Sequence, residues 1–78
     1  MSFQRESVEE VIHRRLDPLF GLDGGEVHVA KVDPDGGEVR VRFGGAYEAC
    51  PGRSVLLSYV VEPVLREELP AVRRVRIG

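Results

Sequence analysis

Residues 38–51, EVRVRFGGAYEACP, decide the fold of this chain because they end a strand and open a helix. Apolar and charged residues alternate over Glu38–Phe43, which predicts a strand with one covered face and one face in water. The apolar members of this strand are Val39, Val41 and Phe43. The pair Gly44-Gly45 that follows permits a tight turn, which can bring backbone amides close to a ligand.

Two further strands are predicted around this one. Glu26–Val32 is rich in β-branched residues, and the segment Asp33-Pro34-Asp35-Gly36-Gly37 is a strong reversal between the two runs. Together these features predict a β-hairpin. A third strand is predicted over Ala71–Ile77, at the end of the sequence.

The first predicted helix begins at a capping box, Ser7-Val8-Glu9-Glu10. We expect Pro18 to kink this helix or to end it near Asp17, with a final turn through Phe20 and a stop at Gly21. Its apolar residues recur at helical spacing and predict one buried stripe. The stripe consists of Val8, Val11, Ile12, Leu16, Leu19 and Phe20.

The second helix is predicted over residues 51–69, with Pro51 in its first turn. Pro63 lies inside this range and should kink the helix into two rods joined at Glu62. The predicted apolar stripe consists of Val55, Leu56, Tyr59, Val60, Val64, Leu65 and Leu69.

The resulting order is helix, strand, strand, helix, strand. Two helices with apolar stripes and a sheet with one apolar face have one economical solution. We therefore predict an α+β fold, a two-layer sandwich with both helices on one face of a small mixed three-stranded sheet. At 78 residues the chain is expected to form one domain over 1–78, with its core at about 7–77.

Composition excludes several classes of protein. The net charge of -2 argues against general nucleic-acid binding, which needs clustered Lys and Arg. The one basic cluster, Arg73, Arg74 and Arg76, is typical of a solvated face or a protected edge strand. No apolar run approaches the ~20 residues of a membrane span, and the first residues lack the apolar region of a signal peptide. We expect a cytoplasmic protein that binds neither nucleic acid nor membrane.

The candidate chemistry centres on Cys50, the only cysteine of the chain. A thiol at a helix N-terminus has a lowered pKa, which favours the thiolate that ligates metals or acts as a nucleophile. Thiolate metal sites usually draw on pairs such as Cys-x-x-Cys, and the position three residues before Cys50 holds Tyr47. On the residues alone, a cysteine packed as a small hydrophobe and a tyrosine covering the apolar edge of the sheet are the favoured interpretations.

Neither histidine is assigned as a ligand, because His13 and His28 have no sequence neighbours at metal-ligand spacing. We expect His13 to be exposed, and His28 to point away from the face that Val27 and Val29 share. A triad that uses Cys50 or Ser54 depends on geometry that the sequence does not contain. The chain is not expected to be an enzyme.

The order of elements and the loop resemble the C-terminal domain of the NifU family, the Nfu-type domain of iron-sulfur cluster scaffolds and carriers. The resemblance covers about Ser7 to Ile77. Its landmarks are Val8-Glu9-Glu10-Val11-Ile12, Asp17-Pro18-Leu19, Asp23-Gly24-Gly25-Glu26-Val27, Gly45-Ala46 through Cys50-Pro51, and Glu67-Glu68-Leu69-Pro70-Ala71-Val72.

In that family the loop carries Cys-x-x-Cys-Pro, and two protomers are expected to share one [4Fe-4S] cluster through four thiolates. Cys50-Pro51 matches the second cysteine, and Tyr47 stands in place of the first. The resemblance thus implies Cys50 as a metal ligand and Tyr47 as a candidate second cofactor-binding residue.

Three interpretations stay open. A homodimer holds a labile or smaller iron-sulfur cluster between protomers, through two Cys50 thiolates with outside thiols or Tyr47 phenolates. Alternatively, the chain is a cofactor-free relative that keeps the fold and its interaction surface. In the third interpretation, Cys50 acts alone as a sulfur-accepting or redox thiol. The implied partners are iron-sulfur assembly or recipient proteins.

Overall fold

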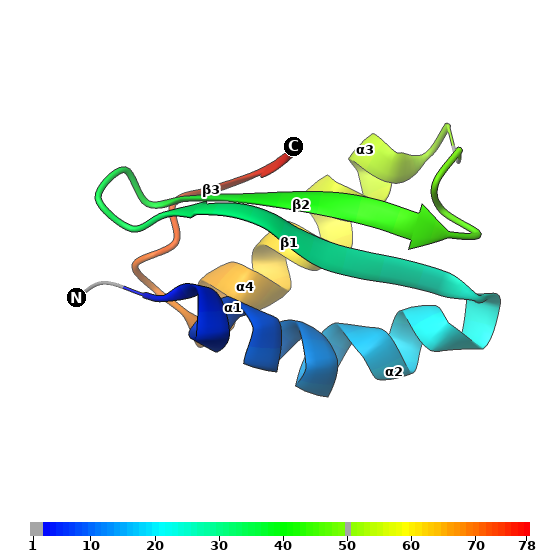
Figure 1. Ribbon diagram of the computed structural model, residues 1–78, viewed down its shortest axis with the longest axis horizontal. Coiled ribbons are helices and arrows are strands. Elements are labelled where there is room, and N and C mark those ends of the chain that lie inside the picture. The colour runs from blue at the N-terminus through cyan, green and yellow to red at the C-terminus, as the bar shows by residue number, and fades with distance from the viewer. Residues whose placement is uncertain (1–2, 50) are drawn as a thin grey trace.

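The computed structural model describes residues 3–49 and 51–78 and confirms the predicted α+β fold. Its sheet has the order β1-β2-β3, with β1 (Gly25–Asp33) antiparallel to β2 (Glu38–Gly45) and β2 parallel to β3 (Arg74–Ile77). Two helices pack on the same side of this mixed sheet (Figure 1). The predicted order of elements is confirmed.

The first helix is continuous but has three parts: α1 (Arg5–Val11), the π turn η1 (Ile12–Leu16) and α2 (Asp17–Phe20). It begins upstream of the predicted capping box, with Gln4 at the N-cap position and no side-chain cap. Phe3 explains the early start, because its side chain is only 3% exposed and anchors the chain before the helix. The capping-box prediction was therefore wrong.

The first helix does not end near Asp17 but continues through Pro18. The amide of Asp17 donates to the carbonyl of Ile12, so the turn before the proline is wide. A wide turn of this kind accommodates a residue that lacks an amide and would otherwise collide with the preceding turn. The helix then tightens into η2 (Gly21–Asp23) and stops at Gly24, whose φ of 75° is left-handed, rather than at the predicted Gly21.

The second helix repeats this construction with α3 (Arg53–Leu56), the π turn η3 (Leu57–Val61) and α4 (Glu62–Glu68). The amide of Glu62 donates to the carbonyl of Leu57, immediately before Pro63. At Glu62, where two rods were predicted to join, the π turn η3 thus gives way to the α-helix α4. The helix begins at Arg53 and not at the predicted position 51, because residues 51–52 still form a turn.

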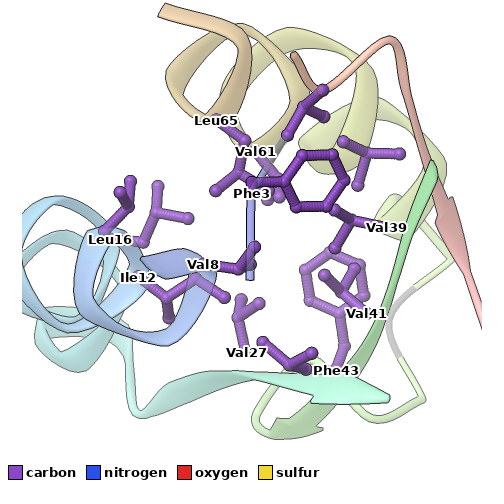
Figure 2. Close-up of a cluster of buried hydrophobic side chains, with 14 of the residues drawn as sticks. Phe3, Val8, Ile12, Leu16, Val27, Val39, Val41, Phe43, Val61 and Leu65 are labelled. Carbon is purple, nitrogen blue, oxygen red and sulfur yellow. The ribbon is translucent and has the colours of Figure 1, made fainter. Parts of the chain in front are cut away.

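The core lies between the helices and the sheet (Figure 2). Its buried residues are Phe3, Val8, Val11, Ile12, Leu16, Phe20, Val27, Val29, Val39, Val41, Phe43, Val61, Leu65, Val72 and Val75. Three predicted stripe residues are instead exposed: Leu19 (51%), Val55 (58%) and Tyr59 (78%). The π turns explain the difference, because a wide turn shifts the inward positions by about one residue relative to a regular 3.6-residue helix.

Both edges of the sheet are partly capped by helix side chains. On β1, the carbonyl of Val29 accepts a hydrogen bond from the Arg5 guanidinium at 2.8 Å. On β3, the amide of Val75 donates to the Glu62 carboxylate at 3.1 Å. These bonds satisfy edge groups that would otherwise be open to another strand. β3 is shorter than the predicted Ala71–Ile77 and begins at Arg74.

No helix in the described part of the chain is both long enough and apolar enough to span a membrane.

Candidate functional site

The loop that follows β2 uses its own backbone amides. The amide of Ala46 donates to the carbonyl of Gly24 at 3.0 Å, which ties the loop to the turn before β1. The amides of Tyr47 and Glu48 donate to the carbonyls of Gly44 and Gly45, each at 3.2 Å. These three amides are engaged within the protein, so the loop does not present them to a ligand as the glycine pair had suggested.

Tyr47 lies against the apolar end of the core. Its ring makes edge-to-face contacts with Phe20, at a centroid distance of 5.3 Å, and with Phe43, at 6.4 Å. A Cβ atom at Gly25 would overlap ring atoms Cδ2, Cε2 and Cζ of Tyr47. The tyrosine ring therefore occupies the space that a side chain at Gly25 would need, which is the packing role expected of a tyrosine covering the edge of the sheet.

The thiol of Cys50 lies outside the described residues, and its assignment as a metal ligand stays a prediction. The flanking segments are held in place. The Arg53 guanidinium donates to the carbonyl of Glu48 at 2.7 Å and so joins the loop to the first turn of α3. The amides of Val55 and Leu56 both donate to the carbonyl of Gly52 at 3.1 Å.

The two histidines line one groove of about 420 Å³ between the first helix and β1. His13 Nδ1 lies 2.6 Å from the Asp17 carboxylate, and His28 Nε2 lies 2.9 Å from the Glu26 carboxylate. His13 is exposed as predicted, and His28 is exposed between the buried Val27 and Val29, which confirms that it points away from their face. The sequence did not reveal their shared groove, because it is formed by segments that only the fold brings together.

The described residues contain no group of three His, Cys, Asp or Glu side chains arranged to hold a metal ion. Ser54 is exposed on α3, and no hydrogen bond is found between it and either histidine in the part of the chain that is described.

Apolar side chains are exposed on the elements that flank the loop. Leu22 in η2 is 85% exposed, and Tyr59 and Val55 lie on the helix that follows the loop. The helix periodicity had assigned Tyr59 and Val55 to the core, so these two surface positions were missed. The break in periodicity at a π turn leaves no clear signal in the apolar pattern.

Taken together, the fold and loop define a small two-layer α+β domain with a single-cysteine loop between a strand and a helix. The family model of the NifU-like domain matches residues 8–76. The chain therefore belongs to the NifU-like domain family, as its resemblance had indicated. This membership associates it with iron-sulfur cluster assembly.

Three relatives share this domain. The chain is 34% identical over 70 residues to the mitochondrial NifU-like protein of Saccharomyces cerevisiae, which covers 90% of this chain and 27% of the relative. It is 32% identical over 68 residues to the mitochondrial NifU-like protein 4 of Arabidopsis thaliana, covering 87% of this chain and 24% of the relative. NifU-like protein 5 of the same plant, also mitochondrial, is 31% identical over 68 residues, covering 87% of this chain and 25% of the relative. The chain thus spans about a quarter of the length of these relatives.

The relatives correct the expected location. All three are named as mitochondrial proteins, which contradicts the cytoplasmic location inferred from the sequence. That inference was a default, drawn from the absence of a membrane or secretory signal, and such an absence does not distinguish one interior compartment from another.

Proposed function

We propose that this domain is a cofactor-free interaction module that docks on proteins of iron-sulfur cluster assembly and does not hold a cluster through the four thiolates of its family. The observation that carries the proposal is the position of Tyr47. Where the family resemblance places the first cysteine of the motif, this chain has an aromatic ring packed on Phe20, Phe43 and Gly25.

The ligand count supports this proposal. A [4Fe-4S] cluster is held by four thiolates, and a symmetric dimer of this chain supplies two from the single cysteine of each protomer. If the Tyr47 phenolate were to complete the set, a change in ring position would open the space above Gly25. Moving the ring would lose its packing against Phe20 and Phe43, and such a loss lowers stability. Tyr47 is therefore better suited to packing than to binding a metal.

A second candidate is a dimer that carries a cluster as cargo on two Cys50 thiolates completed by outside thiols. The match of Cys50-Pro51 to the second half of the family motif favours it. Both candidates share the same partners, namely proteins that assemble or receive clusters. In neither does the domain act as an enzyme, and the mitochondrial relatives support a mitochondrial setting.

The test is anaerobic reconstitution with iron and sulfide, comparing wild type with Tyr47→Cys. We expect the wild-type protein to retain little visible absorbance after desalting. Tyr47→Cys restores the paired thiolates and should elute as a brown dimer. Tyr47→Phe is the matched control for the loss of the phenolic oxygen and should behave as wild type.

Cys50→Ser completes the design, because Tyr47→Cys/Cys50→Ser should lose the colour that Tyr47→Cys gains. A wild-type protein that retains one cluster per dimer as firmly as Tyr47→Cys would overturn the proposal. If that colour disappeared in Cys50→Ser but survived in Tyr47→Phe, the second candidate would replace it.

A further inference from the structure

The face of the sheet away from the helices is rich in charged side chains. Strand residues alternate between the core and this open face, as the burial patterns of β1 and β2 show. Five cations lie on the open face, against three carboxylates, whereas the whole chain has 11 Lys and Arg against 13 Asp and Glu. The cations are Lys31, Arg40, Arg42, Arg74 and Arg76, and the carboxylates are Glu26, Asp33 and Glu38.

Three of these cations form a row across all three strands, which we call the cationic row. Lys31 of β1 pairs directly with Arg40 of β2, and Arg40 pairs directly with Arg76 of β3. The bulge in β1 between Val29 and Lys31 shifts the register and so brings Lys31 opposite Arg40. All three side chains are exposed.

The cationic row is only partly neutralised. Like charges directly opposite one another on neighbouring strands destabilise a sheet. Glu38 offsets some of this cost, since its carboxylate lies 3.0 Å from Arg76 Nε and 3.6 Å from Arg40 Nε. Within residues 3–49 and 51–78, Lys31 makes no ion pair. The row therefore keeps a positive charge that is not fully paired within the domain and that does not stabilise the fold.

We propose that the cationic row docks an acidic helix of a partner protein laid across the strands. The spacing suits such a helix, because neighbouring strands lie about 4.8 Å apart and helix carboxylates at i and i+4 lie about 5–6 Å apart. Arginine side chains also present a planar fork that matches a carboxylate. Outside the open face, acidic residues outnumber basic ones in this chain. An acidic partner is therefore attracted to the open face, where the cationic row lies.

Two other classes of partner fit this face less well. Recognition of single-stranded nucleic acid on a sheet relies on aromatic rings that stack with bases. The open face of the described strands carries no Phe, Tyr, Trp or large apolar residue, and its one ring, His28, lies 2.9 Å from the Glu26 carboxylate. A membrane surface needs apolar anchors in addition to charge for firm binding.

The experiment uses a fluorescein-labelled, helix-forming peptide of alanine with glutamate at i and i+4, and follows its anisotropy as the full chain is added. Wild type should bind it, and binding should weaken as salt is raised. Lys31→Gln/Arg40→Gln/Arg76→Gln should bind at least about tenfold more weakly, as truncated charge pairs at interfaces do. The melting midpoint of this variant should stay close to that of wild type, because the loss of mutual repulsion offsets the loss of the ion pairs from Arg40 and Arg76 to Glu38.

Two matched comparisons make the test specific. Arg40→Gln and Arg66→Gln change the net charge equally, but Arg66 is an exposed residue of α4 outside the row. Only Arg40→Gln should weaken peptide binding, and equal weakening by both would overturn the proposal.

The proposal would also fail if a labelled single-stranded oligonucleotide, or phosphatidylcholine vesicles containing phosphatidylglycerol, bound the row more tightly than the peptide. Cys50→Ser should bind the peptide as wild type does, so this result is independent of any cluster.

Discussion

The two faces of strand β2 place neighbouring residues in opposite surroundings. Val39 and Val41 are fully buried and Phe43 is 4% exposed, whereas Arg40 and Arg42 point into water. On the covered face, these side chains belong to the buried cluster between the helices and the sheet (Figure 2). On the open face, charged side chains lie opposite one another on neighbouring strands, and the Glu38 carboxylate pairs with both Arg40 and Arg76.

This difference separates the residues that determine the fold from those that are available for binding. A buried side chain cannot change without opening a cavity or forcing its neighbours to move. An exposed charge changes the free energy of unfolding by little, because solvent and salt screen it. On the covered face, the Tyr47 ring from the candidate functional loop occupies the space that a side chain at Gly25 would need.

The largest expected effect comes from Phe43→Ala. Removal of this ring should lower the free energy of unfolding by about 3–5 kcal/mol, because it leaves a cavity in the buried cluster beside Tyr47. Arg42→Ala, the adjacent residue on the open face, should change it by less than about 0.5 kcal/mol. Chemical denaturation followed by circular dichroism measures both values.

If Phe43→Ala does not fold, Phe43→Leu provides the same comparison with an expected loss of about 1.5 kcal/mol or less. Equal losses for the substitutions at residues 42 and 43 would contradict the assignment of the two faces.

The second prediction concerns the space shared by Gly25 and Tyr47. Gly25→Ala should destabilise the wild-type protein by about 1–3 kcal/mol, because the added methyl group overlaps the Tyr47 ring. In the Tyr47→Ala background that overlap is gone, and alanine is better suited than glycine to a strand. There, Gly25→Ala should be neutral or stabilising.

A double-mutant cycle of wild type, Gly25→Ala, Tyr47→Ala and the double variant measures this coupling. Additive losses would show that the Tyr47 ring does not occupy the Gly25 space. Such a result would also remove the main support for a packing role of Tyr47.

The covered face was predictable because its signals are local. The alternation of Val39, Val41 and Phe43 with charged residues is enough to define β2 and the side on which the helices pack. The helix stripes were predicted less well, since Val55 and Tyr59 are exposed and Val61 is buried. A regular helical period cannot anticipate a π turn, whose wide geometry changes which residues point inward.

The candidate site was predictable only in part. The packing of Tyr47 was among the expected interpretations, because an aromatic residue just after a strand commonly covers the sheet edge. Its fit over Gly25 joins two residues far apart in the sequence, and nothing local signals it. The cationic row depends in the same way on strand register, which the bulge after Val29 sets.

The smallest expected effects come from the two carboxylates that each serve a pair of arginines. Glu68, at the end of α4, joins the helices through Arg14 at 2.8 Å and Arg15 at 2.5 Å. Glu38 serves the open face in the same way, and both side chains are about one-fifth exposed, at 21% and 20%. Glu68 accepts hydrogen bonds from both of its arginines at shorter distances than those between Glu38 and its arginines, so we expect the helix-bridging carboxylate to contribute more.

A test by pH distinguishes the two carboxylates. The hydrogen bond from Arg14, followed by that from Arg15 and the charges of both arginines, lowers the pKa of Glu68 below its ordinary value of 4.5. A lowered folded-state pKa stabilises the fold above the ordinary value, and this contribution is lost as pH falls through the lowered pKa. Glu68→Gln should therefore melt below wild type at pH 7, and the difference should shrink as the solution is acidified below 4.5. Glu38→Gln should show a smaller difference at pH 7, since the contacts of Glu38 with Arg76 and Arg40 are longer, at 3.0 and 3.6 Å, and an exposed pair of this kind contributes little. If Glu38→Gln were instead the more damaging substitution, the open face would contribute to the fold, and its charges would not be free to serve a partner.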